Sequence, residues 1–545
     1  MKWARRILLG LIILAGVITA LWWEENWRGQ KIWEESCARL RAAGEPVDIA
    51  DIIPPMIPDE ENVAAAPIFA EVAASSYARV ATTRLGTIGS EWKCRGPYGH
   101  ESIPPSRPMS RADLSQVVRW AEFLRETFPA NAPLQPITDP ADEVLHYYSK
   151  WNTEWQEVRE ALKRPQCRWP LEYELGVEME LVHLSCFQQL ANNTRGWIAA
   201  LAAKGDATAY TELLTTMLDL ERCVGKNSAG LISHMVGSTM LMTTLRAWQD
   251  SLPLVSLNEH QLFQLQSRLE RLTLRDGAIA LQRDNVLIMD YCTRVAVTER
   301  ARLLDTLRER PRRWPEKVWP LEDRVFAILF TTSPNGWHLA DMAVLQEALR
   351  SVRAGCVDEE ADVLSKPHVD AMKSTAEGIA VRQGWYTYSR HALVDAVSVS
   401  QKILIRTANT QATVRSAIVW CAAERFRLRH GRLPQSQEEL VPVFLKSALS
   451  DPVDGRPLRF MMKEDGSLVI YSLGWDGKDD GGVRTKRPSE GDLGWASDPM
   501  LLASPDEIRE WAEEDKERAD RANSSRSAIK PTKSKIKIPT IKASP

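Results

Sequence analysis

An uncharged stretch near the N-terminus, Ile7–Trp23, limits what this chain can fold into more than any other feature. As an α-helix its 17 residues extend about 25 Å at ~1.5 Å per residue, which meets the lower limit of ~17–25 residues for crossing a bilayer. Tryptophans favour the headgroup region, because the ring is apolar and its N–H needs a partner. Four of them flank or end the stretch: Trp3, Trp22, Trp23 and Trp27. The sequence therefore predicts a helix that contacts a lipid bilayer through residues 7–23.

The charges around the stretch predict its orientation. Three basic residues precede it: Lys2, Arg5 and Arg6. Under the positive-inside rule they favour a cytoplasmic N-terminus, so we expect the bulk of the chain on the exported side. We expect a single-pass protein of the cytoplasmic (inner) membrane of a bacterium, with residues 1–27 as cytoplasmic stub and transmembrane anchor. The alternative is a signal peptide cleaved near Ala20, which the bulky Ile18 disfavours.

The charge balance is close to neutral, with 69 basic residues, 72 acidic residues and a net charge of -3. This balance disfavours a dedicated nucleic-acid-binding protein, which carries a basic surface, so nucleic acid is not expected as a partner. Hydrophobic residues make up 44% of the chain and charged residues 26%, as in folded proteins. We therefore expect folded domains rather than a chain that is disordered throughout.

Apolar residues recur at helical spacing through most of the remaining chain, which predicts a mainly α protein. Residues 28–109 are expected to form a juxtamembrane helix followed by a proline-rich segment. Residues 110–405 are expected to form a large all-helical ectodomain. No fixed repeat period extends beyond one helical pair, so a regular solenoid is not predicted.

Local signals mark the ends of individual helices. Gly205 suits the position after a helix and Asp206 suits the N-cap of the next one, which predicts a helical hairpin. Ser110 with Asp113 resembles a capping box and predicts that a helix begins there.

Sequence motifs of common enzymes, such as H-E-x-x-H, G-x-S-x-G and Walker A, are absent. His183 and Cys186 share one helical segment, which leaves a nucleophile–base pair open beside the commoner structural histidine. Four glutamates near the start of that segment either favour the helix dipole or supply paired carboxylates: Glu172, Glu174, Glu178 and Glu180. An envelope hydrolase with its active site in the helical domain is therefore the main alternative function.

The eight cysteines form no C-x-x-C pair, which disfavours zinc-ribbon and thioredoxin-like motifs. Export permits disulfides, and Cys94 and Cys167 lie in proline- and glycine-containing loops where they could bridge. The alternative, which we favour, is that most of the cysteines are small, buried apolar side chains.

Residues 406–496 follow a different pattern and are expected to form a small α+β module. A helix is expected to end at His430. Two strands are expected at residues 457–461 and 467–473, joined by a tight turn at 464–466. The module would thus add a short hairpin to an otherwise helical chain.

Several short motifs follow one another in a specific order through the module. They are Arg429-His430-Gly431-Arg432-Leu433-Pro434, Glu438-Glu439-Leu440, Asp451-Pro452, Gly455-Arg456-Pro457-Leu458, Ile470-Tyr471-Ser472-Leu473-Gly474-Trp475-Asp476-Gly477 and Asp492-Leu493-Gly494-Trp495. In this order they resemble the soluble domain of the major pseudopilin of type II secretion, the protein G family. The resemblance implies a pseudopilin-like α+β fold for the module.

The resemblance also implies a calcium site in the loop after the second strand. That family binds calcium there through backbone carbonyls and aspartates. Carried over, Leu473 offers its carbonyl, and Asp476 and Asp492 offer their carboxylates. Asp479 and Asp480 add acidic oxygens in the same loop, where glycines let the backbone bend around a hard cation.

The chain departs from the family at both ends. The loop carries Gly481-Gly482 and a basic insert with Arg484, Lys486 and Arg487, so an acidic turn without metal stays open as the alternative. The N-terminus lacks a prepilin-peptidase site, and roughly 385 residues separate the anchor from the module, so a secretion pilus subunit is not expected. The whole chain resembles uncharacterised single-pass bacterial envelope proteins, a group with no known activity.

Residues 497–545 are expected to form a charged helix followed by a disordered, basic tail. Together these features predict a membrane-anchored, non-enzymatic envelope protein. Its helical ectodomain would bind an unknown envelope protein or act as a scaffold, and calcium would stabilise its pseudopilin-like module. Besides the envelope hydrolase, an accessory component of an export apparatus is a further alternative, based on analogy of fold alone.

Overall fold

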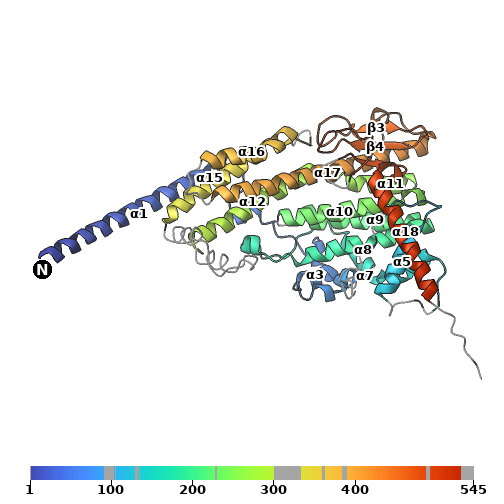
Figure 1. Ribbon diagram of the computed structural model, residues 1–545, viewed down its shortest axis with the longest axis horizontal. Coiled ribbons are helices and arrows are strands. Elements are labelled where there is room, and N and C mark those ends of the chain that lie inside the picture. Colours follow the sequence, from blue (N-terminus) through green and yellow to red (C-terminus); the bar gives the residue numbers. More distant parts are fainter. Residues whose placement is uncertain are drawn as a thin grey trace, which may run out of the picture.

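The computed structural model describes residues 2–90, 104, 106–128, 133, 135–226, 230–299, 333–358, 362–382, 389–485 and 491–528. The protein is mainly helical, with 67% helix and few strands, which confirms the predicted class. Figure 1 shows an elongated body from which the N-terminal helix projects, with the small sheet toward the opposite end. The tail beyond residue 528, Cys94, and Lys486 and Arg487 of the basic insert lie outside the described residues.

Helices account for most of the described elements. The α-helices are α1 (Lys2–Ala42), α2 (Ile49–Ile52), α3 (Pro67–Ala73), α4 (Arg84–Ser90), α5 (Ser115–Thr127), α6 (Pro140–Ser149), α7 (Asn152–Ala161), α8 (Val182–Lys204), α9 (Ala207–Glu221), α10 (Leu231–Ser251), α11 (Glu259–Leu269), α12 (Leu274–Val297), α15 (Asn335–Arg353), α16 (Lys366–Arg382), α17 (Ser389–His430) and α18 (Pro505–Ala528). Short 3-10 or π turns are η1 (Val63–Ala65), η2 (Val80–Thr82), η4 (Tyr173–Glu178), η5 (Arg222–Lys226), η6 (Leu252–Leu254), η7 (Gln437–Leu440) and η8 (Pro499–Leu502).

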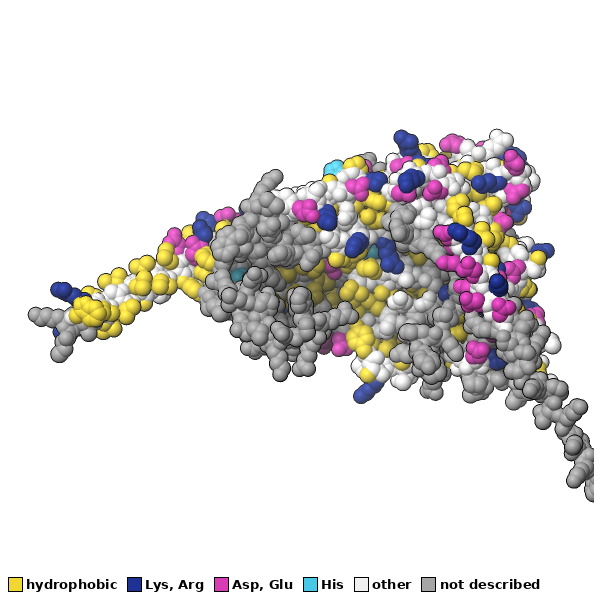
Figure 2. Space-filling view, in the orientation of Figure 1, with side chains coloured by type: hydrophobic (Ala, Val, Ile, Leu, Met, Phe, Trp, Pro, Cys, Tyr) yellow, Lys and Arg dark blue, Asp and Glu magenta, His cyan; other side chains and the backbone are white. Residues whose placement is uncertain are grey.

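Helix α1 runs without a break for 41 residues. Among the described helices it is the one long and apolar enough to cross a membrane, and its most apolar window has no residue buried inside the protein. Figure 2 shows hydrophobic side chains covering this projecting part. The predicted apolar N-terminal helix is therefore present, and it continues directly into the body.

The second half of α1 packs against α15, and the two backbones come closest at a pair of glycines. A methyl group on Gly336 would lie 1.9 Å from the carbonyl oxygen of Glu25, and one on Gly29 would lie 1.9 Å from that of Gly336. The N–H of Gly336 donates to Asn26 Oδ1 (2.9 Å), and Trp337 Nε1 donates to Glu25 Oε2 (2.7 Å). Since these contacts begin two residues after Trp23, the body begins where the apolar stretch ends.

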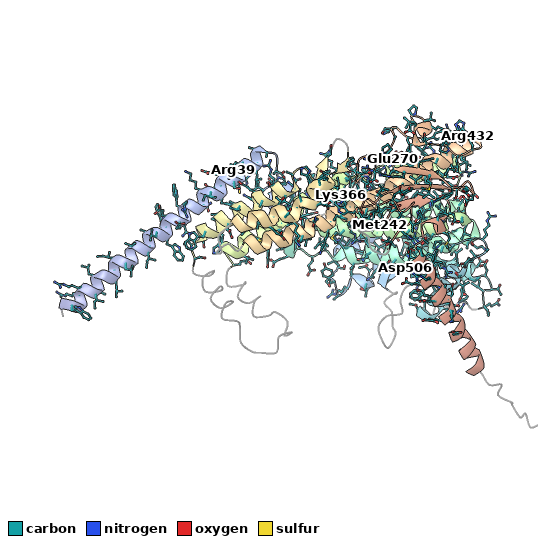
Figure 3. All side chains as sticks on the ribbon, turned by 45° about the horizontal axis from the view of Figure 1, so that its top comes forward. Arg39, Met242, Glu270, Lys366, Arg432 and Asp506 are labelled. Atoms are coloured by element: carbon teal, nitrogen blue, oxygen red, sulfur yellow. The ribbon has the colours of Figure 1, made fainter. Side chains whose placement is uncertain are left out.

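Further along the same interface, polar side chains join α1 to α15. Ser36 Oγ and Arg39 Nη2 both donate to Glu347 Oε1, at 2.7 and 2.6 Å. Gln346 Nε2 donates in turn to Ser36 Oγ (2.8 Å). Figure 3 labels Arg39 on this part of α1. The side chains of Ser36 and Gln346 are buried, so their hydrogen bond is protected from water, whereas Arg39 and Glu347 lie at the exposed edge of the contact.

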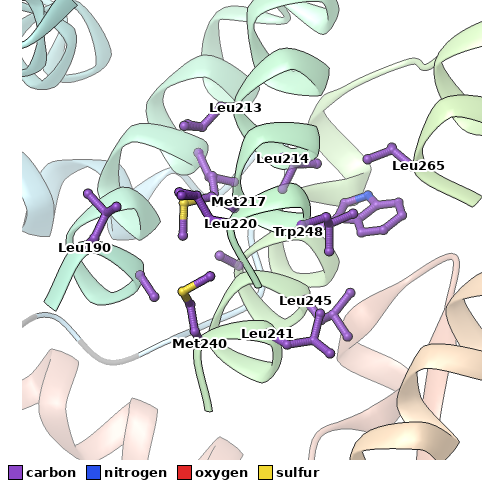
Figure 4. Close-up of a cluster of buried hydrophobic side chains, with 14 of the residues drawn as sticks. Leu190, Leu213, Leu214, Met217, Leu220, Met240, Leu241, Leu245, Trp248 and Leu265 are labelled. Atoms are coloured by element: carbon purple, nitrogen blue, oxygen red, sulfur yellow. The ribbon is translucent and has the colours of Figure 1, made fainter. Parts of the chain in front are cut away.

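The described part of the body contains two large hydrophobic cores beside two smaller clusters. We call the first the α1-side core; it lies among α12, α15, α16 and the first half of α17 and includes Leu281, Met289, Met342, Leu349, Met372 and Leu404. We call the second the distal core; it lies among α3, α5 to α11 and the second half of α17. Figure 4 shows part of the distal core, where Leu214 and Met217 of α9 lie beside Met240 and Leu245 of α10.

Helix α17 contributes to both cores along its 42 residues. Its residues Ile403 and Leu404 lie in the α1-side core, whereas Ala417, Val419 and Phe426 lie in the distal core. The helix ends at His430, as predicted, and Gly431 follows with a φ of 71°. The domain boundary expected between residues 405 and 406 falls inside this helix.

Three antiparallel strands follow α17, in the order β3 (Arg459–Met462), β4 (Leu468–Ser472) and β5 (Leu493–Ala496). A two-stranded ribbon precedes α17 in the chain and consists of β1 (Val357–Asp358) and β2 (Val363–Leu364). All of β4 is buried, and Trp495 of β5 packs in the distal core against Trp248 of α10, with ring centroids 4.9 Å apart. The hairpin predicted from the sequence is present as β3–β4, but its sheet shares a core with the helices.

The charged helix expected within residues 497–545 is present as α18, which begins after Ser504, where Ser504 and Glu507 form a reciprocal cap. Its acidic residues reach back to the N-terminal half of the chain: Asp515 accepts from Arg107 and Arg119, both at 2.7 Å. In Figure 1 it crosses the body at the end far from the N-terminus.

The local signals for helix ends were correct in one place and wrong in another. Gly205 is left-handed after α8, and Asp206 accepts from the N–H of Ala209 at the start of α9, as predicted. The helix expected at Ser110 begins only at Ser115, because Ser110 and Asp113 bond each other in a separate turn.

Replacing Gly336 with alanine is expected to push α15 away from α1, because the new methyl group would overlap backbone atoms rather than a flexible side chain. We expect a loss of about 1–3 kcal/mol from this contact, the usual cost of overpacking. Hydrogen exchange of amides in residues 26–42 measures it. Gly378→Ala in α16 is the control, since a methyl group there meets no atom within 4 Å. Equal exchange in the two variants would contradict the prediction.

Candidate functional site

The five residues predicted to hold calcium lie in the connection from β4 to β5, which we call the acidic loop (residues 473–492). Its glycines adopt positive φ, including Gly474 at 64° and Gly491 at 76°. These two are also in close contact, because a methyl group on Gly474 would lie 2.4 Å from the carbonyl oxygen of Gly491. The two ends of the acidic loop therefore lie side by side, as a closed loop requires.

Two aspartates of the acidic loop bond to the loop itself. Asp476 accepts from the N–H of Lys478 (3.1 Å) through Oδ1 and from that of Gly491 (3.3 Å) through Oδ2. Asp479 Oδ1 accepts from the hydroxyl of Tyr471 (3.0 Å) and from the N–H of Gly481 (3.0 Å). These carboxylates therefore shape the loop by bonding its backbone and the neighbouring strand β4.

Asp492 occupies the interior of the acidic loop and is 1% exposed. Its Oδ2 accepts from the N–H groups of Asp480 (2.9 Å) and Gly482 (2.7 Å). Its Oδ1 is buried and has no hydrogen-bond partner among the described residues. Burial raises the pKa of Asp492 to about 6. The two N–H bonds favour the charged form and lower the pKa, but their effect is smaller than that of burial.

The acidic loop fits a calcium ion only in part. The unpartnered Asp492 Oδ1 is the kind of buried oxygen that a cation satisfies. However, within the described residues no three Asp, Glu, His or Cys side chains are grouped to hold a metal. Asp480 is exposed, and the N–H of Leu473 donates to Asp451 Oδ2 (3.3 Å). The five predicted residues thus share one loop, but they do not converge as a ligand cage.

Asp451 is a structural residue of this site that the sequence analysis did not single out. It is fully buried, and its Oδ1 accepts from the N–H of Val453 and from Ser472 Oγ, both at 2.9 Å. Its Oδ2 accepts from Arg459 Nη1 (2.8 Å). Asp451 therefore ties the turn before β3 to the end of β4, where the acidic loop begins. The Asp451-Pro452 motif was the available signal, but in the sequence it contributed only to the resemblance of the module.

Trp475 connects the acidic loop to the α1-side core rather than to a ligand. Its Nε1 donates to Asp370 Oδ1 (3.0 Å) on α16, and Lys366 Nζ lies 4.8 Å from the centre of its ring. Figure 3 labels Lys366 at the start of that helix. Arg484 of the basic insert donates from Nε to Glu507 Oε2 of α18 (3.0 Å). The loop is thus held from two sides by helices.

The groups of the alternative hydrolase site make other contacts among the described residues. His183 stacks on Trp169 with ring centroids 4.3 Å apart, and burial lowers its pKa to about 3. Burial raises the pKa of Cys186 to about 12, so its thiol is a poor nucleophile at neutral pH. Glu178 instead lies 3.6 Å from Arg294. A cavity of about 180 Å³ borders Cys186, but His183 is not in its lining.

Comparisons with known protein families, with curated proteins and with solved structures found no match to this chain. The resemblance of the module to pseudopilins, and that of the whole chain to envelope proteins, therefore remain predictions.

Asp492→Asn is expected to remove a pH dependence of stability. The folded-state pKa of Asp492 is about 6, above the ~3.9 of an unfolded aspartate, so only the folded state binds the extra proton between these values. The free energy of unfolding therefore rises as the pH falls from about 7 to 4, by up to about 3 kcal/mol from this group. Hydrogen exchange of β5 amides, corrected for intrinsic rates, measures the difference between the wild type and the variant.

Glu464→Gln is the control, because its carboxylate is exposed in the neighbouring β3–β4 turn. It should follow the wild-type pH dependence. If Asp492→Asn also followed it, the unpartnered buried oxygen would not be the titrating group.

Proposed function

We propose that this protein is a non-enzymatic scaffold held at a membrane by α1. The observation that carries the proposal is the continuity of α1, whose first half is exposed and apolar and whose second half is fixed to α15. A signal sequence that is cleaved has no need of such an interface with the mature protein. The lipid bilayer would surround residues 7–23.

The proposed orientation places the N-terminus in the cytoplasm and the body on the exported side of a bacterial inner membrane. Basic residues before the apolar stretch support it. Gly336 in the first turn of α15 contacts Asn26, close to the end of the stretch, which supports a position of this turn near the headgroups in the proposed arrangement. The body would therefore rest directly on the membrane surface rather than on a flexible stalk.

The role proposed for the pseudopilin-like module is to join helices into one rigid body that presents a surface to an envelope protein partner. Three contacts support this role. Gln249 Nε2 of α10 donates to the carbonyl of Gly494 in β5 (3.0 Å), and Gln266 Nε2 of α11 donates to that of Phe444 (2.8 Å). Trp475 adds the contact with α16. A module that only decorated the helical region would leave such buried polar groups unsatisfied.

Membrane anchoring predicts resistance to extraction. The full-length protein should stay in the membrane pellet after alkaline carbonate treatment, and Ile12→Arg with Val17→Arg should release it. Each arginine costs about 2.5–3.5 kcal/mol at the centre of a spanning helix, and the stretch is already at the minimum length. Ile32→Arg, beyond the stretch on the exposed side of α1, is the control and should stay bound. Release of the wild type would refute the anchor, and a mature mass lacking the first residues would favour the cleaved signal.

Calcium is proposed to stabilise the acidic loop by binding at Asp492. The full-length chain should melt at a higher temperature in calcium than in chelator, since a ligand at about 100 times its dissociation constant adds about 2.7 kcal/mol. Asp492→Ala should abolish the difference. Glu464→Ala, an exposed acidic residue of the β3–β4 turn, is the control and should preserve it. Equal melting in calcium and chelator would show that the loop needs no metal.

A further inference from the structure

Two buried cysteines from separate segments lie in contact in the distal core. Cys167 follows α7 in an irregular segment, and Cys223 lies in the π turn η5 after α9, 56 residues further along the chain. Their exposed fractions are 1% and 0%. Cys167 Sγ lies 3.8 Å from the carbonyl oxygen of Cys223, and the nearby Cys167 thiol raises the pKa of Cys223.

The backbone on both sides of this contact is fixed by further bonds. Trp169 Nε1 donates to the same carbonyl of Cys223 (2.9 Å). From the other segment, Arg222 donates to the carbonyls of Pro165 (3.2 Å) and Arg164 (3.1 Å). The segment that carries Cys167 and the turn that carries Cys223 are therefore held together independently of the two thiols. A covalent bond between the sulfurs would join segments that the fold already brings together.

We propose that Cys167 and Cys223 are a disulfide-forming pair, which becomes oxidised when the chain folds in an oxidising compartment. The reaction is a thiol–disulfide exchange with a small-molecule or protein disulfide as oxidant. One cysteine thiolate attacks the oxidant and forms a mixed disulfide, releasing one oxidant thiolate. The second cysteine thiolate then displaces the other half of the oxidant. The new Sγ–Sγ bond replaces the oxidant's S–S bond, and the two thiol protons end on the two released thiols.

Both thiols are protected once the protein is folded. The neighbouring Cys167 thiol and burial raise the pKa of Cys223 well above its usual value, so the Cys223 thiol forms almost no thiolate in the folded protein. Oxidation therefore takes place during folding or local opening. The bond then closes a long loop and restricts the unfolded chain, which is how a disulfide stabilises the folded state.

The test uses the full-length protein and two sources of oxidant. In the first arm, the chain is isolated from cells, denatured and alkylated without reduction, and its peptides are analysed by mass spectrometry. In the second arm, the purified chain is reduced, unfolded and refolded in a buffer of reduced and oxidised glutathione before the same analysis. In the second arm we expect six of the eight cysteines to be alkylated and one cross-linked peptide pair, Cys167 with Cys223.

Cys223→Ser should leave Cys167 open to alkylation, whereas Cys186→Ser, a buried cysteine of α8, should leave the cross-link in place. The cross-linked wild type should also melt at a higher temperature before reduction than after it, a shift that is absent in Cys223→Ser. Alkylation of both cysteines in the second arm, or a bond to another cysteine, would overturn the pairing. A disulfide found after refolding but not in the chain isolated from cells would support the pairing of Cys167 with Cys223. It would contradict the proposed export of the body.

Discussion

The close contact of α1 with α15 is the constraint on which the arrangement of the body depends. The glycine pair lets two helix backbones meet, and the bonds of Ser36 with Glu347 and with the buried Gln346 continue the contact along α1. Helix α15 packs in turn on α12, α16 and α17. A helix with an exposed, apolar first half is thereby joined to the α1-side core without an intervening linker, so a movement of α1 is transmitted to the whole body.

The distal core explains why the C-terminal module is not an independent unit. The helix of the module is the second half of α17, which packs against α10 and α11. The central strand of the module, β4, contributes Leu468 and Ile470 to the distal core. Three tryptophan rings pack together in this core. They belong to Trp248 of α10, Trp420 of α17 and Trp495 of β5. Experiments on an isolated module would therefore expose part of this core, and the full chain is the appropriate object.

The sequence was sufficient for features that depend on local chemistry. The apolar helix, the end of α17 at His430, the hairpin β3–β4 and the junction of Gly205 with Asp206 all follow from hydrophobic period or from side-chain capping. The sequence was insufficient where contacts between segments far apart in the chain determine the local structure. The cap predicted at Ser110 became an isolated turn, and Trp475 bonds to Asp370, 105 residues away in sequence. The hydrogen bonds that backbone N–H groups donate to Asp476, Asp479 and Asp492 likewise depend on how the acidic loop folds back on itself.

The length of α17 has a geometric consequence for an anchored protein. At ~1.5 Å per residue its 42 residues measure about 63 Å, and they run from the α1-side core to the sheet. Since α1 leaves the body at the opposite end, α17 would set the distance between the bilayer and the sheet in the proposed anchored arrangement. A molecule that meets the sheet and α18 would do so several tens of ångströms away from the lipid surface, at a height that the helix fixes.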